Sequence, residues 1–399
     1  PAEHNRGFEM RRRRRPTELA LLAVVATVLA ACSAAGAQTQ GGSAGPGVAQ
    51  ASVVVRPDGA DSWHPDRPVI VSVTDGTLTE VSVVDKDGRR LRGHTLADKT
   101  MWTSTADLLR FDTRYRVRAE AVDAEGRTTT VRSTFRTERP KDLVHTSVLP
   151  GDGQVVGVGM PIVVTFDSPV PGRAVVERLL SVRTKPAVSG GWYWVSDQQV
   201  RWRPREFWRP GTDVTVTTSL DGVHLGKGTW GDDDDRVDFT VGDAVVSTVD
   251  ISGHTMTVRR NGEVLRKVPV TTGKPGWDTR NGIKVIISKD REVVMDAATI
   301  DVDKDDPEYY RLDVEYAMRV TWSGEYLHAA PWSVSSQGED NVSHGCTGMS
   351  NVNASWFYNL SKPGDVVEYV NGVRSLEAWN GYTDWNVSWQ DWRAGSALR

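Results

Sequence analysis

Short runs of alternating residues, separated by turn residues, recur from about residue 52 to residue 370 and constrain the fold more than any other feature. In residues 115–121, for example, apolar and charged side chains alternate strictly. Because successive side chains on a strand point to opposite faces, this pattern predicts a half-buried β-strand. The chain has 399 residues, of which 39% are hydrophobic and 25% charged, which is typical of a globular protein with several domains. The sequence therefore predicts a mainly β protein.

Two segments between residues 52 and 242 repeat the same order of strand patterns. The strand pattern at 68–73 matches the one at 161–166, and Trp202 follows Trp102 by one hundred residues. Two tandem immunoglobulin-like β-sandwiches, over residues 52–137 and 138–242, fit this number and spacing of strands. The cysteine pair of antibody domains is absent, so we expect purely apolar cores. The four carboxylates at 232–235 lack the spacing and the bidentate Glu of a calcium site, so a solvated loop is expected there.

Residues 243–371 form a third unit that is again rich in strand patterns. Residues 259–261 separate two strand patterns and predict a hairpin. Buried strands are expected at 284–287 and 293–295, and a closing strand at 366–370. Residues 353–360 predict a short helix, because their apolar side chains share one helical face. A Trp-rich tail follows over residues 372–399.

The N-terminal residues are typical of an export signal. A basic block at 11–15 precedes a nearly all-apolar stretch at 19–31, which is too short to span a bilayer comfortably. The end of this stretch, Leu29-Ala30-Ala31-Cys32, resembles the bacterial lipobox, and this resemblance implies cleavage before Cys32 and a diacylglycerol on its sulfur. We therefore expect a leader and signal peptide over 1–31 and a lipidated Cys32 with a flexible linker over 32–51. An ordinary signal with an incidental cysteine is the alternative.

The charge and the cysteine count narrow the function further. The formal net charge is -4, and the residues before Cys32 carry six Arg and three Glu, which is +3, so the chain from Cys32 onward carries -7. No basic stripe is present, which argues against nucleic-acid binding. The chain has two cysteines. If Cys32 is lipidated, Cys346 is the only remaining thiol and no disulfide can form within the mature chain.

Cys346 stands in the motif Ser343-His344-Gly345-Cys346, which has the residue types that a thiol nucleophile requires. The thiolate is the reactive form, so an enzyme must lower the thiol pKa or supply a base, and histidine is the usual base. His344 is too close in sequence to reach the sulfur well, whereas His328 on an adjacent strand can approach it directly. We therefore predict His328 as the base and His344 as a supporting or substrate-facing group. The amides of Gly345 and Cys346 are predicted to form an oxyanion hole.

This constellation, with His328 fifteen positions before the motif, resembles the signature of the L,D-transpeptidases, whose catalytic domain is called YkuD. The segments 272–277, 327–334 and 354–358 agree with it. The match covers about a third of the chain. The whole layout of lipobox, two immunoglobulin-like domains, catalytic domain and Trp-rich tail is similar to that of the mycobacterial and actinobacterial members.

The resemblance implies a cysteine-dependent acyl transfer in peptidoglycan. Cys346 would attack the carbonyl at the L-centre of diaminopimelate in a tetrapeptide stem and expel the terminal D-Ala. The side-chain amine of diaminopimelate on a neighbouring stem would then resolve the acyl-enzyme and form a cross-link. Carbapenem β-lactams would acylate the same thiol. The family's fold would place Cys346 under a flap of a β-sandwich-like domain, and the carbonyl of Ala329 would orient His328.

Carried over by position, further residues would bind substrate. Tyr310 and Trp332 would line the substrate path, and Met295 and Ser323 match other pocket positions; core packing is the alternative for Trp332 and Met295. Family members usually have Asn two residues after the cysteine, where this chain has Gly348. A slower turnover or a different acceptor would follow from the loss of that carboxamide.

The other histidines carry no recognisable motif. We interpret five of them as surface or packing residues without evident partners: His64, His94, His145, His224 and His254. The sequence has no HExxH motif, no zinc-spaced Cys/His set and no nucleotide-binding glycine loop. Neither a metal ion nor a cofactor is therefore expected.

The tail carries four of the fifteen tryptophans. Trp385, Trp389 and Trp392 have the i, i+4, i+7 spacing of one helical face. We expect this helix to dock on its own enzyme rather than to bind glycan. By the resemblance, the tail would pack on the catalytic domain and brace it against the preceding sandwich.

Three hypotheses besides the transpeptidase remain. An L,D-carboxypeptidase would use the same site with water as the acceptor. A non-enzymatic, lipid-anchored wall-binding scaffold with a degraded site has only Gly348 in its favour. A papain-like peptidase is disfavoured because its cysteine precedes its histidine, which is the reverse of the order here. For the transpeptidase we expect a monomer, anchored to the membrane outside the cytoplasm and facing the cell wall.

Overall fold

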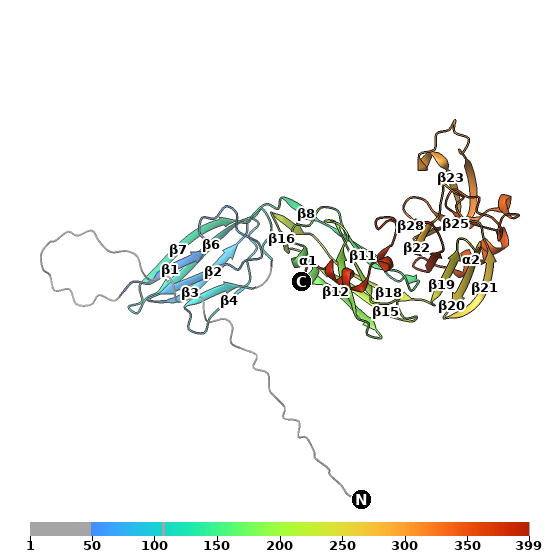
Figure 1. Ribbon diagram of the computed structural model, residues 1–399. Helices are drawn as coiled ribbons and strands as arrows, with labels where there is room; N and C mark the ends of the chain where they lie inside the picture. Colours follow the sequence, from blue (N-terminus) through green and yellow to red (C-terminus); the bar gives the residue numbers. More distant parts are fainter. Residues whose placement is uncertain (1–48, 106–107, 399) are drawn as a thin grey trace, which may run out of the picture. The chain divides into compact units, whose positions relative to one another are not determined.

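The computed structural model describes residues 49–105 and 108–398, and most of the regular structure in them is β-strand (Figure 1). Strands make up 46% and helices 9%, which confirms the predicted mainly β class. The residues from Gln50 onward form one unit by their contacts. No helix in the described ranges is long and apolar enough to cross a membrane. The predicted signal peptide and Cys32 lie outside the described residues.

The first sandwich, residues 51–137, consists of two sheets with the strand orders β1-β2-β5-β4 and β3-β6-β7. In β6, Tyr115, Val117 and Ala119 are buried whereas the arginines between them are exposed, which confirms the predicted alternation. The core between the sheets is apolar and includes Trp102 and Phe135. The strands are β1 (Ser52–Arg56), β2 (Ile70–Thr74), β3 (Thr77–Val84), β4 (Gly93–Thr95), β5 (Met101–Ser104), β6 (Arg114–Val122) and β7 (Thr128–Arg136).

The second sandwich, residues 142–241, has the sheets β13-β14-β11-β9 and β10-β18-β15-β12, with a small sheet β16-β17-β8 beside them. The loop predicted at 232–235 is partly wrong, because Asp234 and Asp235 begin β18 and pair with β15. Its elements are β8 (Asp142–Val144), β9 (Thr146–Leu149), β10 (Val155–Val156), β11 (Ile162–Phe166), α1 (Arg173–Leu179), β12 (Leu180–Lys185), β13 (Gly190–Trp194), β14 (Gln199–Pro204), β15 (Asp213–Ser219), β16 (His224–Gly226), β17 (Thr229–Gly231) and β18 (Asp234–Val241).

The third unit packs a six-stranded sheet, β21-β20-β19-β27-β22-β28, near a four-stranded sheet, β23-β24-β25-β26. Helix α2 confirms the predicted helix, and the Ser350 side chain caps it by accepting from the Asn353 amide. The elements are β19 (Val245–Asp250), β20 (Thr255–Arg260), β21 (Glu263–Pro269), β22 (Arg280–Val285), β23 (Ser288–Asp296), η1 (Ala297–Ile300), β24 (Arg311–Arg319), β25 (Tyr326–Ala329), η2 (Pro331–Ser333), β26 (Thr347–Met349), α2 (Asn351–Leu360) and β27 (Val366–Val370).

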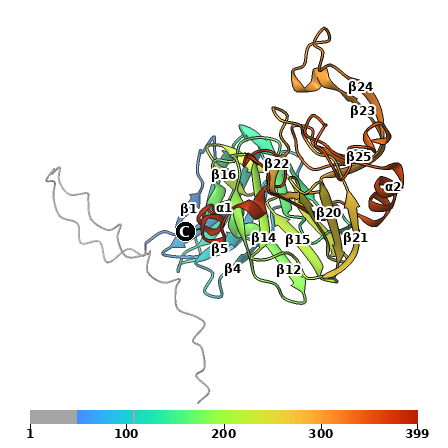
Figure 2. The same cartoon turned by 45° about the vertical axis from the view of Figure 1, so that its right-hand side comes forward.

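Strands β23 and β24 form a long hairpin that projects from the third unit (Figure 2). The strand predicted at 293–295 exists, but the prediction that it is buried is wrong. Val294 is 49% exposed and lines a cavity together with Val293 and Met295.

The second sandwich and the third unit share one hydrophobic core. Val285 and Val366 of the third unit and Tyr382 of the tail belong to the same buried cluster as the sandwich core. The Gly157 amide also donates to the Pro363 carbonyl at 2.9 Å. Packing is therefore continuous across the boundary expected near residue 242, and the predicted domain limits stay a prediction.

The tail forms β28 (Arg374–Ser375), η3 (Asp384–Asn386) and α3 (Trp389–Ala394). The single helical face predicted for Trp385, Trp389 and Trp392 is therefore wrong, because Trp385 lies in η3. The chain between the two helices is extended at Val387, and the Ser388 side chain caps α3.

These tryptophans surround one arginine of the second sandwich. The Arg203 guanidinium lies 4.9, 5.4 and 4.6 Å from the ring centroids of Trp385, Trp389 and Trp392. Burial lowers the pKa of Arg203 to about 10. The Trp392 indole donates to the Gly191 carbonyl at 2.8 Å. In the tail, β28 pairs with β22 of the catalytic unit, whereas α3 packs on β13 of the second sandwich. The tail thus contacts both units that it was expected to brace.

Candidate active site

His328 lies on β25, and Cys346 directly precedes the neighbouring parallel strand β26. Strand β26 begins directly after Cys346 and pairs with β25, so that Gly348 lies opposite His328. Side chains two residues apart on a strand point to the same face, so Cys346 and His328 face the same side. Both line a cavity of about 190 Å³. The structure thus brings together the two residues predicted as nucleophile and base.

The motif around the thiol is fixed by its own hydrogen bonds. Ser343 Oγ donates to the Cys346 carbonyl at 2.6 Å and accepts from the Gly345 amide at 3.1 Å. Gly345 has φ = 116°, a conformation that favours glycine. Thr279 Oγ1 donates to the Gly345 carbonyl at 2.9 Å. Because the Gly345 amide is already engaged, the structure argues against the oxyanion-hole role predicted for it.

His328 is in the state that a general base requires. Its ring nitrogen Nδ1 lies 2.8 Å from the Ala329 carbonyl, as expected from the resemblance. A proton on Nδ1 donates in this contact, which leaves Nε2 unprotonated. Burial lowers the pKa of His328, and the contact with Ala329 only partly offsets this. The imidazole is therefore neutral at neutral pH.

The Cys346 thiol is also in its neutral form. Burial raises its pKa to about 12. Its Sγ donates to the Gly324 carbonyl at 3.6 Å, so the thiol hydrogen bond in this structure does not go to His328. A neutral thiol beside a neutral imidazole needs proton transfer at the moment of attack.

A buried charge network near the thiol was missed by the sequence analysis. Lys284 Nζ lies 2.5 Å from Glu325 Oε2, and Arg280 Nη1 lies 3.0 Å from Glu325 Oε1. Glu325 raises the pKa of the Cys346 thiol and Lys284 lowers it, both less than burial does. The sequence offered one signal for Lys284, because a lysine inside a strand that is predicted to be buried needs a partner. It offered no such signal for Glu325.

His344 belongs to a cluster on the other side of the motif. Its Nε2 lies 2.7 Å from Glu308 Oε2, which also accepts from Lys274 Nζ at 2.6 Å. The rings of Trp277 and Tyr310 lie 4.7 and 4.9 Å from the His344 ring. His344 is thus held by Glu308, in keeping with the supporting role predicted for it.

Two cavities meet at the thiol. The smaller one is bordered by His328, Trp332 and Gly348. The larger one, about 580 Å³, includes Ser323 and Arg280. Four residues border both cavities: Met295, Tyr310, His344 and Cys346.

The predicted substrate-binding residues therefore all lie at these cavities. Trp332 is 54% exposed, so the core-packing alternative is wrong for this residue. Met295, the other residue with that alternative, is half-buried at the border of both cavities. Burial raises the pKa of the Tyr310 hydroxyl to about 12, so this group is neutral and can donate a hydrogen bond.

Gly348 is closely packed where the family usually has Asn. Its amide and carbonyl both bond to Thr271, at 2.9 and 3.1 Å. A Cβ at this position would lie 3.0 Å from both Ala330 Cβ and Thr271 Cγ2. A larger side chain would therefore require these neighbours to move.

The fold and this site define a β-rich enzyme with the arrangement of a thiol acyltransferase. Residues 244–368 match the L,D-transpeptidase catalytic domain, and residues 60–224 match a bacterial Ig domain. The second match covers parts of both sandwiches. These matches agree with the predicted fold class of immunoglobulin-like units followed by a YkuD catalytic domain.

The chain is also similar to characterised proteins over most of its length. It is 42% identical to L,D-transpeptidase 2 of Mycobacterium tuberculosis over 341 residues, which is 85% of this chain and 83% of that protein. It is 33% identical to L,D-transpeptidase 5 of the same species, over 86% of this chain and 76% of that protein. A solved structure of the L,D-transpeptidase LdtMt1 in complex with imipenem is 44% identical, with a TM-score of 0.49 over 56% of this chain and 97% of that one.

The chain belongs to the L,D-transpeptidase family, whose members cross-link peptidoglycan. It is therefore an enzyme, and the comparisons favour the transpeptidase over the non-enzymatic scaffold.

Proposed function

We propose that Cys346 forms the acyl-enzyme with a tetrapeptide stem. His328 Nε2 takes the thiol proton as Sγ bonds to the carbonyl carbon at the L-centre of diaminopimelate. The amide bond to D-Ala breaks, and His328 returns the proton to the leaving D-Ala amine. A thioester remains on Cys346. For this step the thiol must turn from the Gly324 carbonyl towards His328.

The second half-reaction uses an amine as the acceptor. The side-chain amine of diaminopimelate on a neighbouring stem attacks the thioester, gives its proton to His328, and forms an amide between two third-position residues. The Cys346 sulfur leaves as a thiolate and recovers the proton from His328. Atoms and charge balance over the two steps, and no cofactor is consumed.

The observation that carries this proposal is the position of Cys346 at the border of two cavities. A hydrolase needs one peptide site and a path for water, whereas a transferase must hold two peptides on either side of one carbonyl. The larger cavity is lined by carboxylates, which suit the ammonium group of an acceptor, and by guanidinium groups, which suit its carboxylates. The acidic residues include Asp278 and Asp301, and the basic ones are Arg280, Arg319 and Arg374. We therefore place the acceptor stem in the larger cavity and the donor stem in the smaller one.

Products of a reaction with a disaccharide-tetrapeptide test the proposal. Mass spectrometry is expected to show a dimer that has lost one D-Ala. The Cys346→Ser and His328→Gln variants are expected to give no dimer. A tripeptide product without dimer would replace the transpeptidase with the L,D-carboxypeptidase, and no product of either kind would contradict both.

Carbapenem β-lactams are proposed as covalent inhibitors of the same thiol. Their strained lactam carbonyl can accept the Cys346 sulfur as a peptide carbonyl does, and ring opening leaves a thioester. Intact mass after incubation with imipenem is expected to rise by one carbapenem per chain. Loss of this adduct in Cys346→Ser, but not in His94→Ala, would place it on the thiol.

We also propose that the mature protein is a lipoprotein on the outer face of the cytoplasmic membrane. The support is the basic block, the apolar stretch and the lipobox-like residues that end at Cys32. After expression in an actinobacterial host, a Cys32→Ala variant is expected to leave the membrane fraction. Equal membrane association of both forms would contradict lipidation at Cys32.

A further inference from the structure

His64, Glu138 and His224 converge at the contact between the two sandwiches. One ligand atom from each residue lies within 4.8 Å of the others. His64 Nε2 lies 3.5 Å from Glu138 Oε2, and the two imidazole rings are 4.9 Å apart. The interpretation of these histidines as residues without partners is therefore wrong. The sequence could not show the cluster, because its members are far apart along the chain.

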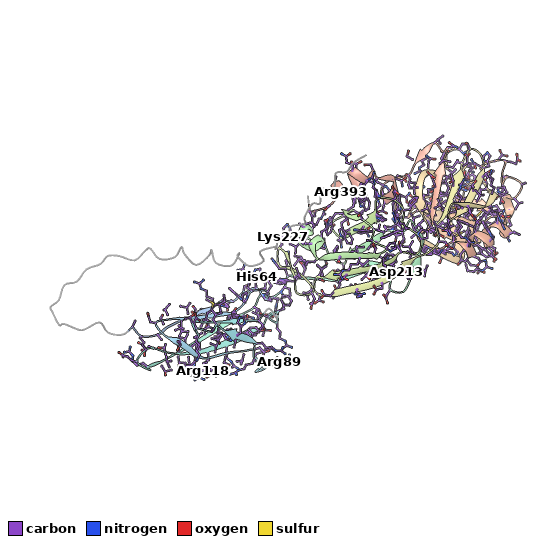
Figure 3. The ribbon with its side chains drawn as sticks, turned by 90° about the horizontal axis from the view of Figure 1, so that it is seen from below. His64, Arg89, Arg118, Asp213, Lys227 and Arg393 are labelled. Carbon is purple, nitrogen blue, oxygen red and sulfur yellow. The ribbon has the colours of Figure 1, made fainter. Side chains whose placement is uncertain are left out.

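The backbone holds two of these residues together. The Glu138 amide donates to the Trp63 carbonyl at 3.0 Å, so that Glu138 runs beside His64 at the end of the first sandwich; His64 is labelled in Figure 3. The third residue comes from the second sandwich, where His224 in β16 pairs with Trp230 in β17. The three side chains are half-buried. They are therefore positioned by folded elements rather than by a flexible loop.

The surrounding groups orient the possible ligand atoms. The indole of the fully buried Trp230 donates to Glu138 Oε1, which leaves Oε2 directed at His64. On the other side of the His64 ring, Nδ1 lies 3.9 Å from Asp66 Oδ1. Metal-binding histidines commonly direct the second ring nitrogen at a carboxylate, and metal-binding carboxylates are themselves hydrogen-bonded. Glu138 has the second feature in its bond from Trp230, whereas Asp66 lies near His64 Nδ1 but beyond hydrogen-bond distance.

We propose that His64, Glu138 and His224 form a zinc site, with water in the fourth position. Two imidazoles and one carboxylate are a ligand set that zinc accepts, whereas calcium and magnesium prefer oxygen ligands alone. Zinc–ligand distances of about 2.0–2.2 Å require ligand atoms roughly 3.3 Å apart in a tetrahedron. The His64–Glu138 separation already approaches this value, and His224, whose ligand atom lies within 4.8 Å of the others, must close by up to about 1.5 Å, which side-chain rotation supplies.

A bound ion at this place would tie the first sandwich to the second. A ligand that binds only the joined arrangement stabilises it by mass action. The site lies outside the catalytic unit. A bound ion would therefore fix the first sandwich relative to the second and would not take part in acyl transfer. An ion pair between protonated His64 and Glu138 is the alternative that the experiment must separate from zinc binding.

Zinc titration of the metal-free chain by calorimetry tests the proposal. The titration is done in a Cys346→Ser background, so that the catalytic thiol does not contribute a site. One zinc ion per chain is expected. His224→Ala and Glu138→Gln are each expected to weaken binding by about 100-fold or more, since even outer partners of metal ligands cost about 10- to 100-fold. Glu138→Gln keeps an oxygen for Trp230, so it tests the charge without removing the hydrogen bond.

His145→Ala is the matched control, because His145 lies 3.3 Å from Asp232 and 3.7 Å from Asp233, but belongs to no group of metal-ligand type found among the described residues. It is expected to leave zinc affinity unchanged. Cobalt substitution gives a second readout, and the visible d–d bands of a tetrahedral nitrogen and oxygen site are expected only where His224 is present. No zinc binding, or binding that is equal in His224→Ala and in its parent, would overturn the proposal and leave the ion pair.

Discussion

Lys284 and Glu325 form a buried ion pair beside the nucleophile. Lys284 Nζ lies 2.5 Å from Glu325 Oε2, and both side chains are almost fully shielded from water. Arg280 shares the same carboxylate. This places two cations and one anion under the Cys346 motif, so Glu325 links the stability of the catalytic unit to the electrostatics of its thiol.

Replacing Glu325 is therefore expected to destabilise the enzyme. Glu325→Gln leaves Lys284 buried without its counter-ion, and breaking a buried pair in this way costs about 3–5 kcal/mol. Chemical unfolding followed by circular dichroism measures the loss. Glu315→Gln is the control, because Glu315 pairs with Arg291 on the surface and exposed pairs contribute little. A Glu325→Gln variant as stable as this control would contradict the account.

The pH dependence of activity and of thiol alkylation should reflect a neutral Cys346 thiol and a neutral His328 imidazole. Burial lowers the pKa of His328, so the acidic limb of kcat/KM is expected below 6.5, the ordinary pKa of histidine. Burial raises the pKa of Cys346 to about 12, so the rate of thiol alkylation by iodoacetamide should still be rising at pH 9. An acidic limb above 6.5 would contradict the lowered pKa of His328, and alkylation that is already maximal at pH 7 would indicate a thiolate–imidazolium pair.

Position 348 should be intolerant of a side chain. Gly348→Ala adds a Cβ 3.0 Å from Ala330 Cβ and Thr271 Cγ2, and overpacking of this kind costs about 1–3 kcal/mol. Thr271→Ser removes the opposing methyl group, so the double variant is expected to regain part of that stability. Thermal unfolding of the unaltered enzyme, the two single variants and the double variant gives the coupling free energy between positions 348 and 271. Strictly additive effects would show that Gly348 is not limited by this contact.

The tail should contribute stability through its buried tryptophan. Trp392 is 1% exposed and packs over Arg203, so Trp392→Ala is expected to cost about 3–5 kcal/mol. Trp379 is 62% exposed and serves as the matched control, with little change expected for Trp379→Ala. Equal unfolding midpoints for the two variants would contradict the docking of α3 on the second sandwich.

Local patterns predicted the elements of this fold well. The alternation in β6, the hairpin of β20 and β21 and the helix α2 follow from residues close together in sequence, so periodicity and turn residues suffice to predict them. The burial of residues 293–295 in β23 was predicted wrongly, because a short apolar run looks the same in sequence whether it lies in a core or lines a cavity. The Trp spacing in the tail suggested one helix, but the chain is extended at Val387, and η3 contacts β22 whereas α3 contacts β13.

The sequence predicted those residues of the candidate site that belong to the family motif or match it by position. Cys346 and His328 could be named because they carry the family signature, and the cavities contain the residues that the resemblance supplied. The Lys284–Glu325 pair and the cluster of His64, Glu138 and His224 depend on long-range packing, which one sequence does not reveal. The engagement of the Gly345 amide by Ser343 likewise depends on the turn that the backbone adopts.

The mass of the acyl-enzyme tests the central claim most directly. The enzyme is mixed with a tetrapeptide stem, quenched in acid, and digested for peptide mapping by mass spectrometry. The account predicts an added stem that lacks its terminal D-Ala on the peptide containing Cys346, and none in Cys346→Ser. An adduct on another residue, or dimer formation by Cys346→Ser at the rate of the unaltered enzyme, would contradict it.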